Sequence, residues 1–544
     1  MNQNATQRFD YIVVGAGSSG AVVASRLTED PDVSVLLLEA GGPDRHPFIH
    51  MPMAFAKAWK LKNYNWFYES EPEPELNGRR LEINRGKGLG GSSSVNGMQF
   101  IRGNSLDYDY WAQSGLKGWS YAEVLPYFKR LETYWGGEND YRGGSGPIQV
   151  SRSVDPGNLH DRVEAAAVAK GYPINPDYNG ATQEGVSRVE NSTGGGRRSS
   201  TARGYLMPAM GRPNLTVLTH ALTERVLLES GRAVGIAYRR DGKAEKAYAE
   251  REVILSAGSF SSPQILMLSG IGPADELREH GITVVHDLPG VGKNLSEHPN
   301  SAAVFKVRSR ETYEKYLRAD RVVANALSWF LSKTGAFSEI PGGSYIFARS
   351  RPELARPDLQ VIWFGLTQLA HIWFPGVTKP PLFYVSCRGG LLHPRSRGWV
   401  KLRSADPADK PRIFFNMFSE PEDLRAVVRF FHIAREFAAT SPLAEFIERE
   451  VRPGPDAKTD ADIEAYIRET TGHRFHPLGT CTMGTGPDAV VDAELKVRGI
   501  EGLRVVDASV MPDEPTGNTN VPSIMIGEKG ADLIRGQSLP PAEV

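Results

Sequence analysis

The chain has 544 residues and a formal net charge of −1, from 63 Lys and Arg against 64 Asp and Glu. This length exceeds one ordinary hydrophobic core, which predicts two domains or one large interwoven unit. The balanced charge gives no basic surface for nucleic acid, and two cysteines, Cys387 and Cys481, are too few for a disulfide framework. No apolar run approaches the roughly 18 residues of a transmembrane helix, and residues 1–10 do not resemble a secretion signal. We therefore expect a cytoplasmic protein, with peripheral contact to the inner membrane left open.

The first predicted unit is a strand, a glycine-rich turn and a helix close to the N-terminus. Residues 11–14 are an apolar run typical of a buried strand, residues 18–27 have helical composition, and residues 33–38 form a second apolar strand that ends at Glu39. The turn has the G-x-G-x-x-G spacing that lets a pyrophosphate approach a helix N-terminus, and Glu39 can accept hydrogen bonds from ribose hydroxyls. This order predicts a dinucleotide site, without separating FAD from NAD. The expected contacts are Gly15, Gly17, Ser18, Ser19, Gly20, Glu39 and Ala40.

A second glycine-rich loop follows at residues 85–103. Gly88, Gly90 and Gly91 precede three serines at 92–94. The loop therefore offers backbone N–H groups and hydroxyls that can wrap phosphates and the edge of a flavin. The alternative is a flexible surface turn.

The middle of the chain is rich in aromatic residues and lacks such motifs. Aromatic pairs recur at 329–330, 363–364, 373–374 and 383–384, a density that suits either an apolar pocket wall or a large core. Residues 370–381, in which proline and glycine surround aromatics, are predicted as a loop over a pocket.

The C-terminal region combines an apolar strand with two closely spaced histidines. Residues 503–506 form the strand, which ends at Asp507, either a helix cap or a group that faces a ligand. His473 and His476 flank Phe475, and a histidine suits general-base chemistry near neutral pH, although most histidines are structural. No Cys or His cluster has metal-ligand spacing, so no metal site is expected.

Five blocks of sequence, in this order along the chain, resemble the signatures of the glucose-methanol-choline (GMC) oxidoreductase family. They read RGKGLGGSSSVNGMQFIRG at 85–103, GSFSSPQILMLSGIGP at 258–273, LPGVGKNLSEHP at 288–299, HPLGTCTMG at 476–484 and VVDASVMP…GNTN at 505–520. The resemblance spans residues 9–534 and implies FAD rather than NAD as the dinucleotide.

The resemblance also implies a mixed α/β fold. A Rossmann-like FAD-binding domain would carry an inserted substrate domain built from an antiparallel sheet and helices. The FAD-binding domain is expected to be discontinuous, over residues 1–156, 199–306 and 468–544, with the substrate domain over 157–198 and 307–467.

Further FAD contacts follow from the same resemblance. Asn96 and Gly97 would lie near the isoalloxazine ring, and Val226 would lie beside the adenine unless it is an ordinary core valine. Val95 stands where some family members carry a histidine bound covalently to flavin, so FAD is expected to bind non-covalently. The expected contacts outside the first unit are Arg85, Gly86, Leu89, Gly90, Gly91, Ser92, Asn96, Gly97, Val226, Ala257, Gly258, Asp507, Ala508, Asn518, Asn520 and Val521.

His476 matches the active-site histidine of the family, and Asn520 matches the position where members carry Asn or His. We expect His476 to act as general base on an alcohol hydroxyl and Asn520 to orient the substrate and stabilise the developing alkoxide. His473 is expected to be structural or at the pocket rim, because strand positions three apart face opposite sides. His298 has no predicted role in proton transfer. The expected pocket residues are Phe475, Gly343 and Trp363.

The likeness to the bacterial choline and alkanol dehydrogenase branch implies oxidation of a primary alcohol to an aldehyde, with hydride transfer to flavin N5. Electrons would pass to a quinone or another carrier. The alternatives are an oxidase that reduces O2 to H2O2 and an FAD-containing lyase. In the choline branch a Glu stands where this chain has Gly343, with Glu339 four positions away, which favours a neutral alcohol over choline. No oligomeric state is predicted.

Overall fold

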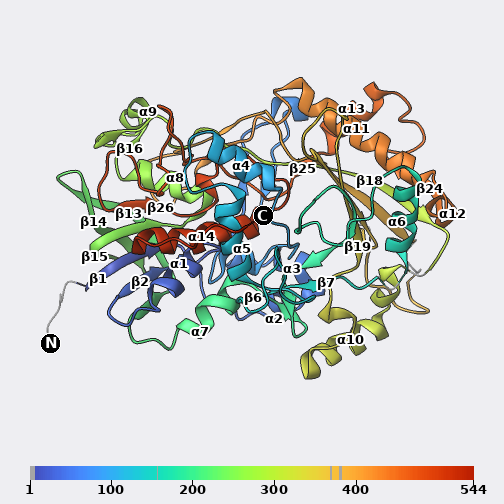
Figure 1. Ribbon diagram of the computed structural model, residues 1–544, viewed down its shortest axis with the longest axis horizontal. Helices are drawn as coiled ribbons and strands as arrows, with labels where there is room; N and C mark the ends of the chain where they lie inside the picture. The colour runs from blue at the N-terminus through green and yellow to red at the C-terminus, as the bar shows by residue number, and fades with distance from the viewer. Residues whose placement is uncertain (1–6, 156, 311, 368–369, 379–382, 544) are drawn as a thin grey trace.

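The computed structural model describes residues 7–155, 157–310, 312–367, 370–378 and 383–543. Two seven-stranded sheets organise these residues. Figure 1 shows the first sheet at the left, where the blue helix α1 (Gly20–Leu27) and the red helix α14 (Asn520–Arg535) lie beside it. The second sheet lies at the right, with the orange helix α11 (Pro421–Ala438) against it.

The first sheet is parallel at its centre and antiparallel at one edge. In order across the sheet, the strands are β12 (Leu215–Leu218), β2 (Val35–Leu38), β1 (Gln7–Val14), β15 (Lys243–Leu255), β14 (Arg232–Arg240) and β13 (Ala221–Glu229), with β26 (Leu503–Val505) beside β15. The pairs among β12, β2, β1, β15 and β26 are parallel, and β14 and β13 add an antiparallel edge. The whole of β2 is buried, as in parallel sheets covered on both faces, and this accounts for its unbroken run of Val and Leu.

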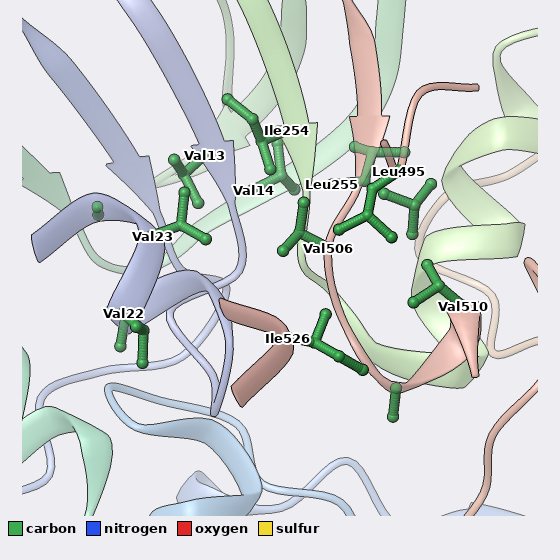
Figure 2. Packing of buried hydrophobic residues seen from close by; sticks show 14 of the residues in the cluster. Val13, Val14, Val22, Val23, Ile254, Leu255, Leu495, Val506, Val510 and Ile526 are labelled. Atoms are coloured by element: carbon green, nitrogen blue, oxygen red, sulfur yellow. The ribbon is translucent and has the colours of Figure 1, made fainter. Parts of the chain in front are cut away.

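Both ends of the chain contribute to the core of this sheet. Figure 2 shows the packing of these buried side chains: Val13, Val14, Val22, Val23, Ile254, Leu255, Leu495, Val506, Val510 and Ile526. The Ser19 hydroxyl before α1 donates to the Ser523 carbonyl of α14 at 2.8 Å, across 504 positions of sequence. The C-terminal helix is therefore part of the N-terminal unit.

The second sheet is antiparallel throughout. In order, its strands are β24 (Ile447–Arg452), β18 (Pro299–Val307), β21 (Tyr384–Leu391), β20 (Leu359–Phe364), β19 (Gly343–Ala348) and β8 (Gly185–Arg188), with β25 (Gly472–His473) beside β18. Its core includes Val427, Phe430 and Phe431 of α11. The predicted mixed α/β class, with one Rossmann-like sheet and one antiparallel sheet, is confirmed.

Strand β18 crosses the predicted domain boundary at residue 306. Residues 301–307 pair with β21 and β24 of the predicted substrate segment, whereas Pro299 and Asn300 pair with β25, which lies within the predicted FAD-binding segment 468–544. Hydrogen bonding along a strand decides which sheet it joins, and sequence motifs do not report it. The wider division into two domains stays a prediction.

The remaining elements connect and cover the two sheets. The other helices are α2 (Pro47–His50), α3 (Phe55–Ala58), α4 (Ser105–Gln113), α5 (Tyr121–Leu131), α6 (Leu159–Ala169), α7 (Met207–Ala209), α8 (Gly258–Leu268), α9 (Ala274–Glu279), α10 (Ala319–Ser332), α12 (Leu443–Phe446) and α13 (Asp460–Thr470). Six short ribbons pair β3 (Tyr68–Glu69) with β4 (Glu82–Ile83), β5 (Glu132–Thr133) with β6 (Ile148–Gln149), β7 (Ser151–Arg152) with β9 (Glu190–Asn191), β10 (Thr193–Gly194) with β11 (Arg197–Arg198), β16 (Ile271–Gly272) with β17 (His286–Asp287), and β22 (Trp399–Lys401) with β23 (Arg412–Phe414). None of the described helices is long and apolar enough to cross a membrane.

Candidate active site

A cavity lies at the carboxyl ends of the parallel strands, beside the turn that precedes α1. We term it the glycine-loop cavity, and its empty volume is about 1180 Å³. Ligand sites of parallel α/β sheets lie at this edge of the sheet. The expected contacts that line it are Gly15, Gly17, Ser18, Ser19, Glu39, Ala40, Arg85, Gly86, Gly91, Ser92, Ala257, Gly258, Asp507 and Ala508.

The three glycine positions of the turn are occupied by glycine for different structural reasons. A Cβ on Gly15 would lie 2.5 Å from the Ser256 carbonyl oxygen, and one on Gly20 would lie 2.0 Å from the Gly15 carbonyl oxygen. A Cβ on Gly17 would meet no described atom within 4 Å, so it would project into open space. Gly15 and Gly20 are therefore required by the fold, whereas Gly17 leaves room for a ligand to approach the backbone.

Glu39 is held in place by backbone amides. Its carboxylate accepts hydrogen bonds from the N–H groups of Ala16 at 3.0 Å, Gly41 at 2.8 Å and Gly88 at 2.9 Å. Burial raises the pKa of Glu39, and the three amide donors oppose that rise. Glu39 thus joins the first glycine turn to the second glycine-rich loop, and it lines the cavity in which a ribose was expected.

Asp507 plays a similar part at the other wall of the cavity. One carboxylate oxygen accepts from the Gly258 N–H at 2.9 Å and from the Ser262 hydroxyl at 2.6 Å, and the other accepts from the N–H and hydroxyl of Ser509. It therefore caps the short turn that follows β26 and also anchors the start of α8. The cap is therefore observed, and Asp507 also lines the glycine-loop cavity; its contact with a ligand stays a prediction.

A second cavity continues from the first. We term it the histidine cavity, and its empty volume is about 1340 Å³. Ser18, Arg85, Ser92, Ala508 and Ser523 line both cavities, so the two are contiguous. Together they suit an extended dinucleotide, with its adenosine end by Glu39 and its redox ring in the histidine cavity.

The histidine cavity brings together the two expected catalytic side chains. His476 and Asn520 both line it, as do Asn96, Gly97 and Asn518 of the expected FAD contacts. His476 is almost fully buried, with 6% of its surface exposed, and its backbone N–H is bound by the Glu297 carboxylate at 2.9 Å.

His298 lies directly behind His476. The Nδ1 atoms of the two rings are 2.9 Å apart, and His298 Nε2 lies 2.8 Å from the Leu392 carbonyl oxygen. A carbonyl only accepts hydrogen bonds, so Nε2 of His298 carries a hydrogen and its Nδ1 is the acceptor in the neutral ring. His476 therefore carries its hydrogen on Nδ1, and its Nε2 is left with a free lone pair. This tautomer is the one that a general base requires.

The surroundings keep both histidines uncharged. Burial lowers the pKa of His298 to about 3, and burial also lowers the pKa of His476 well below 6.5, helped by the nearby cations Arg474 and Arg85. Glu514 Oε2 lies 3.1 Å from His298 Nε2, but burial raises the pKa of Glu514 well above its ordinary value. The shifts of both partners oppose charge, so this contact is a neutral one and not an ion pair.

Asn520 is oriented by the glycine-rich turn. The Ser18 hydroxyl donates to the Asn520 Oδ1 atom at 2.8 Å, which directs the side-chain amide from the first residue of α14. With the oxygen engaged, the NH2 group remains as a donor at the cavity. His476 Nε2 as acceptor and Asn520 Nδ2 as donor provide the two polar functions that an alcohol oxygen requires.

The other wall of the histidine cavity is a face of the second sheet with added aromatics. Ile362 and Phe364 of β20 line the cavity, and Arg388 of β21 lies beside Ile362. Phe475 also lines it, with its ring 5.5 Å from that of Trp59. Phe475 has φ of 64°, a left-handed conformation that is strained for a bulky residue.

Several expected residues do not line either cavity. Trp363 points to the opposite face of β20 from Ile362 and Phe364 and stacks on Phe305, because side chains alternate along a strand. Val226 is buried, and its N–H binds Ser269 Oγ; Thr223 of the same strand lines the glycine-loop cavity instead. The other expected residues outside the two linings are Gly20, Leu89, Gly90, Gly343 and Val521.

Sequence reasoning missed several residues that the structure brings to the site. His298 had a signal, its place in the NLSEHP block, but nothing local marked its contact with His476. Trp66 and Tyr68 line the glycine-loop cavity; their segment, NWFYESEPEPELNGR, carries likeness to the choline and alkanol dehydrogenase branch but was not predicted to contact a ligand. The described part of the predicted pocket loop, residues 370–378, does not line either cavity; residues 379–381 lie outside the described residues. Among the described residues no cluster of His, Cys, Asp or Glu could hold a metal ion.

Comparison with known proteins agrees with this geometry. Two family models described as GMC oxidoreductase match residues 9–300 and 394–527. The chain belongs to the GMC oxidoreductase family. Among curated GMC relatives, an oxygen-dependent choline dehydrogenase of Cronobacter sakazakii is 45% identical over 540 residues, covering 97% of this chain and 95% of the relative. Another, from Chromohalobacter salexigens, is 44% identical and covers 99% and 97%.

Solved structures of GMC oxidoreductases share the fold. A pyridoxine 4-oxidase from Mesorbium loti has a TM-score of 0.85 at 29% identity, covering 96% of this chain and 98% of that one. A formate oxidase from Aspergillus oryzae has a TM-score of 0.90 at 27% identity, covering 98% and 99%. A fungal aryl-alcohol oxidase has a TM-score of 0.85 at 26% identity, with the same two coverages.

As a GMC oxidoreductase, the protein binds FAD, and its two contiguous cavities fit this cofactor. The open space above Gly17 would take the pyrophosphate, and Ser92 of the Gly91–Ser94 turn lines both cavities. The hydroxyls of Ser93 and Ser94 instead donate to the Gly90 and Leu89 carbonyls and hold the loop together. Val95, which lines the histidine cavity, has no nucleophilic atom and cannot form a bond to flavin. Binding at this position is therefore non-covalent.

Proposed function

We propose that this FAD-dependent GMC oxidoreductase oxidises a primary alcohol to an aldehyde. One observation carries the proposal: the free Nε2 of His476 and the amide donor of Asn520 belong to side chains that border the same cavity. A base and a hydrogen-bond donor at one oxygen are the groups that alcohol activation needs.

The protein's own part in the reaction is proton removal and orientation. His476 Nε2 takes the hydroxyl proton, and Asn520 donates to the oxygen as negative charge develops there. The bound flavin supplies the acceptor for the carbon-bound hydride. His298 holds the imidazole of His476 in the required tautomer, so that no ring rearrangement precedes the proton transfer.

We propose a quinone or another electron carrier as the final acceptor. The relatives that are about 45% identical are named choline dehydrogenases, which supports a dehydrogenase, but the same names call them oxygen-dependent, which supports the second candidate below. Molecular oxygen, with H2O2 as product, is the second candidate, because the solved structures similar to this chain include three oxidases.

Anaerobic mixing of the purified yellow protein with a panel of primary alcohols tests the proposal. Bleaching of the flavin band by an alcohol, with the aldehyde as product, is the expected result. Air is then admitted: slow recolouring in air, with fast recolouring by a quinone, supports the dehydrogenase, and fast recolouring in air supports the oxidase. No bleaching by any alcohol would contradict the proposed function and return the lyase to consideration.

A further inference from the structure

The histidine cavity carries an excess of positive charge. Three arginines line it, Arg85, Arg388 and Arg474, and its described lining contains no Asp or Glu. Charges in a buried site are poorly screened by water, so a wall of this composition favours anions and disfavours cations.

Arg388 has no carboxylate partner within the described part of the chain. It lies on β21, opposite Ile362 of β20, on the face of the second sheet that borders the cavity. Its guanidinium donates from Nε to Ser386 Oγ at 3.2 Å, a single weak bond for a group with five N–H donors. Burial lowers the pKa of Arg388, because desolvation disfavours the charged guanidinium.

Arg474 is similarly short of partners. One of its N–H groups donates to Gln360 Oε1, while its buried Nη1 atom has no hydrogen-bond partner among the described residues. Burial lowers the pKa of Arg474 to about 10, and Tyr345 and Glu297 offset part of that effect. The Glu297 carboxylate does not line the cavity. Arg474 therefore lines the same cavity as His476 with a guanidinium group that is incompletely hydrogen-bonded.

Arg85 differs from the other two arginines. It donates from Nη1 to the Phe475 carbonyl oxygen at 2.7 Å and lines both cavities, so it stands at their junction. The two arginines left for a ligand of the histidine cavity are Arg388 and Arg474. Phe364, Phe475 and Trp59 supply the apolar surface of the same cavity.

We propose that the substrate is a primary alcohol that also carries a carboxylate, which Arg388 and Arg474 bind while the hydroxyl meets His476. This inference rests on the alcohol oxidation proposed above and names the class of alcohol. Guanidinium groups bind carboxylates in a bidentate manner, and the aromatic walls suit an apolar body between the two ends of the molecule. The carboxylate takes no part in the redox step; it fixes the position of the carbinol carbon.

The charge of the cavity separates this protein from its choline dehydrogenase relatives. A quaternary ammonium group is held by anions and by aromatic faces. Here the described lining provides aromatics but no carboxylate, and two incompletely bonded guanidinium groups would repel the cation. Identity of about 45% over the whole chain therefore does not carry over to the substrate.

Matched substrates test the proposal on the intact FAD-loaded enzyme. One pair is 4-(hydroxymethyl)benzoate and its methyl ester, a second is 4-hydroxybutanoate and its amide, and choline is the cationic comparison. We expect flavin reduction per unit concentration to favour the acid about 10- to 100-fold in at least one pair, the range for a charged hydrogen bond. Choline should be slower than that acid. Preference for the neutral member in both pairs, or for choline, would overturn the proposal.

Variants connect the preference to the arginines. Arg388→Met and Arg474→Met should each lower kcat/KM for the acid about 10-fold or more through a raised KM, with less than about a threefold change for the neutral partner. Arg388→Lys, which keeps the charge, should recover part of the loss and also shows that the site tolerates substitution. Arg425→Met removes an exposed arginine of α11 and is the matched control. Equal losses for acid and neutral partner would contradict a carboxylate site.

A binding measurement separates the two proposals. The unreactive anion 4-methylbenzoate should shift the flavin absorption band and bind at least about 10-fold more weakly to Arg388→Met. If neutral alcohols reduce the flavin but no acid is preferred, only the carboxylate site is wrong. If no alcohol reduces it and 4-methylbenzoate still binds through Arg388, the anion site stands while alcohol oxidation fails.

Discussion

The Nδ1 atoms of His476 and His298 face each other at 2.9 Å, in rings set at 88° to one another and drawn from segments 178 positions apart. Because His298 donates from Nε2 to the Leu392 carbonyl, it can only accept at Nδ1 while neutral. The geometry thus links the backbone carbonyl of Leu392, directly after β21, to the tautomer of the proposed base. His298 acts through His476, as a positioning residue.

Removal of His298 should therefore slow flavin reduction without removing the base. We expect His298→Ala to lower the anaerobic reduction rate by about 10- to 10³-fold, since loss of a residue that fixes a histidine tautomer costs up to about 10⁴-fold elsewhere. His298→Asn, whose amide oxygen can replace Nδ1 as acceptor, should recover part of the rate. Equal rates for the Ala and Asn variants, at equal FAD content, would reduce His298 to a packing role.

Removal of the base itself should have the larger effect. We expect His476→Ala to slow flavin reduction by about 10²-fold or more, the usual contribution of a general base. Asn520→Ala should be less impaired, because a water can replace part of its donation. Stopped-flow reduction under anaerobic conditions measures both, with His432→Ala on the exposed side of α11 as control. A near wild-type rate for His476→Ala would refute its assignment.

The pH dependence of flavin reduction should reflect the burial of His476. The neutral imidazole is the active form, and its pKa is lowered well below 6.5, so the base stays neutral as the pH falls through the range where an ordinary histidine gains a proton. The reduction rate should be level from neutral pH down to 6.5 and decline only below it. If the reduction rate falls on acidification with a midpoint at or above pH 6.5, burial does not lower the pKa of His476.

Two glycines of the same turn should respond differently to alanine. In Gly17→Ala the added Cβ meets no described atom within 4 Å, so the FAD-free variant should unfold at an unchanged temperature. Its affinity for FAD should fall by about 10-fold or more, because the methyl group occupies space that the ligand needs. Gly20→Ala would place Cβ 2.0 Å from a backbone carbonyl, and it should lower the stability of the FAD-free protein by about 1–3 kcal/mol. Thermal unfolding of both FAD-free variants and flavin titration measure the difference. Equal unfolding temperatures for the two variants would contradict it.

The local spacing of residues was sufficient to predict the nucleotide-binding unit. The apolar run before the glycine turn became β1, the helical segment became α1, and Glu39 lies at the end of β2, because these features depend on neighbours within about 30 residues. The family signatures in turn predicted FAD and the second, antiparallel sheet. Single residues were harder to predict. Val226 and Trp363 line neither cavity, and Trp363 lies on the face of β20 opposite Ile362 and Phe364 because side chains alternate along a strand.

The sequence by itself determined the dinucleotide unit, since the spacing of its motif has a direct physical meaning. Through its resemblance to the GMC family it also predicted the fold class, FAD as the cofactor and the type of chemistry. Only the tertiary structure decided that His298 sets the tautomer of His476, that Ser18 orients Asn520 across 502 positions, and that Arg388 and Arg474 border one cavity without a carboxylate. Hydrogen bonds and cavity charge arise between segments that are distant along the chain, and no local pattern records which of them meet.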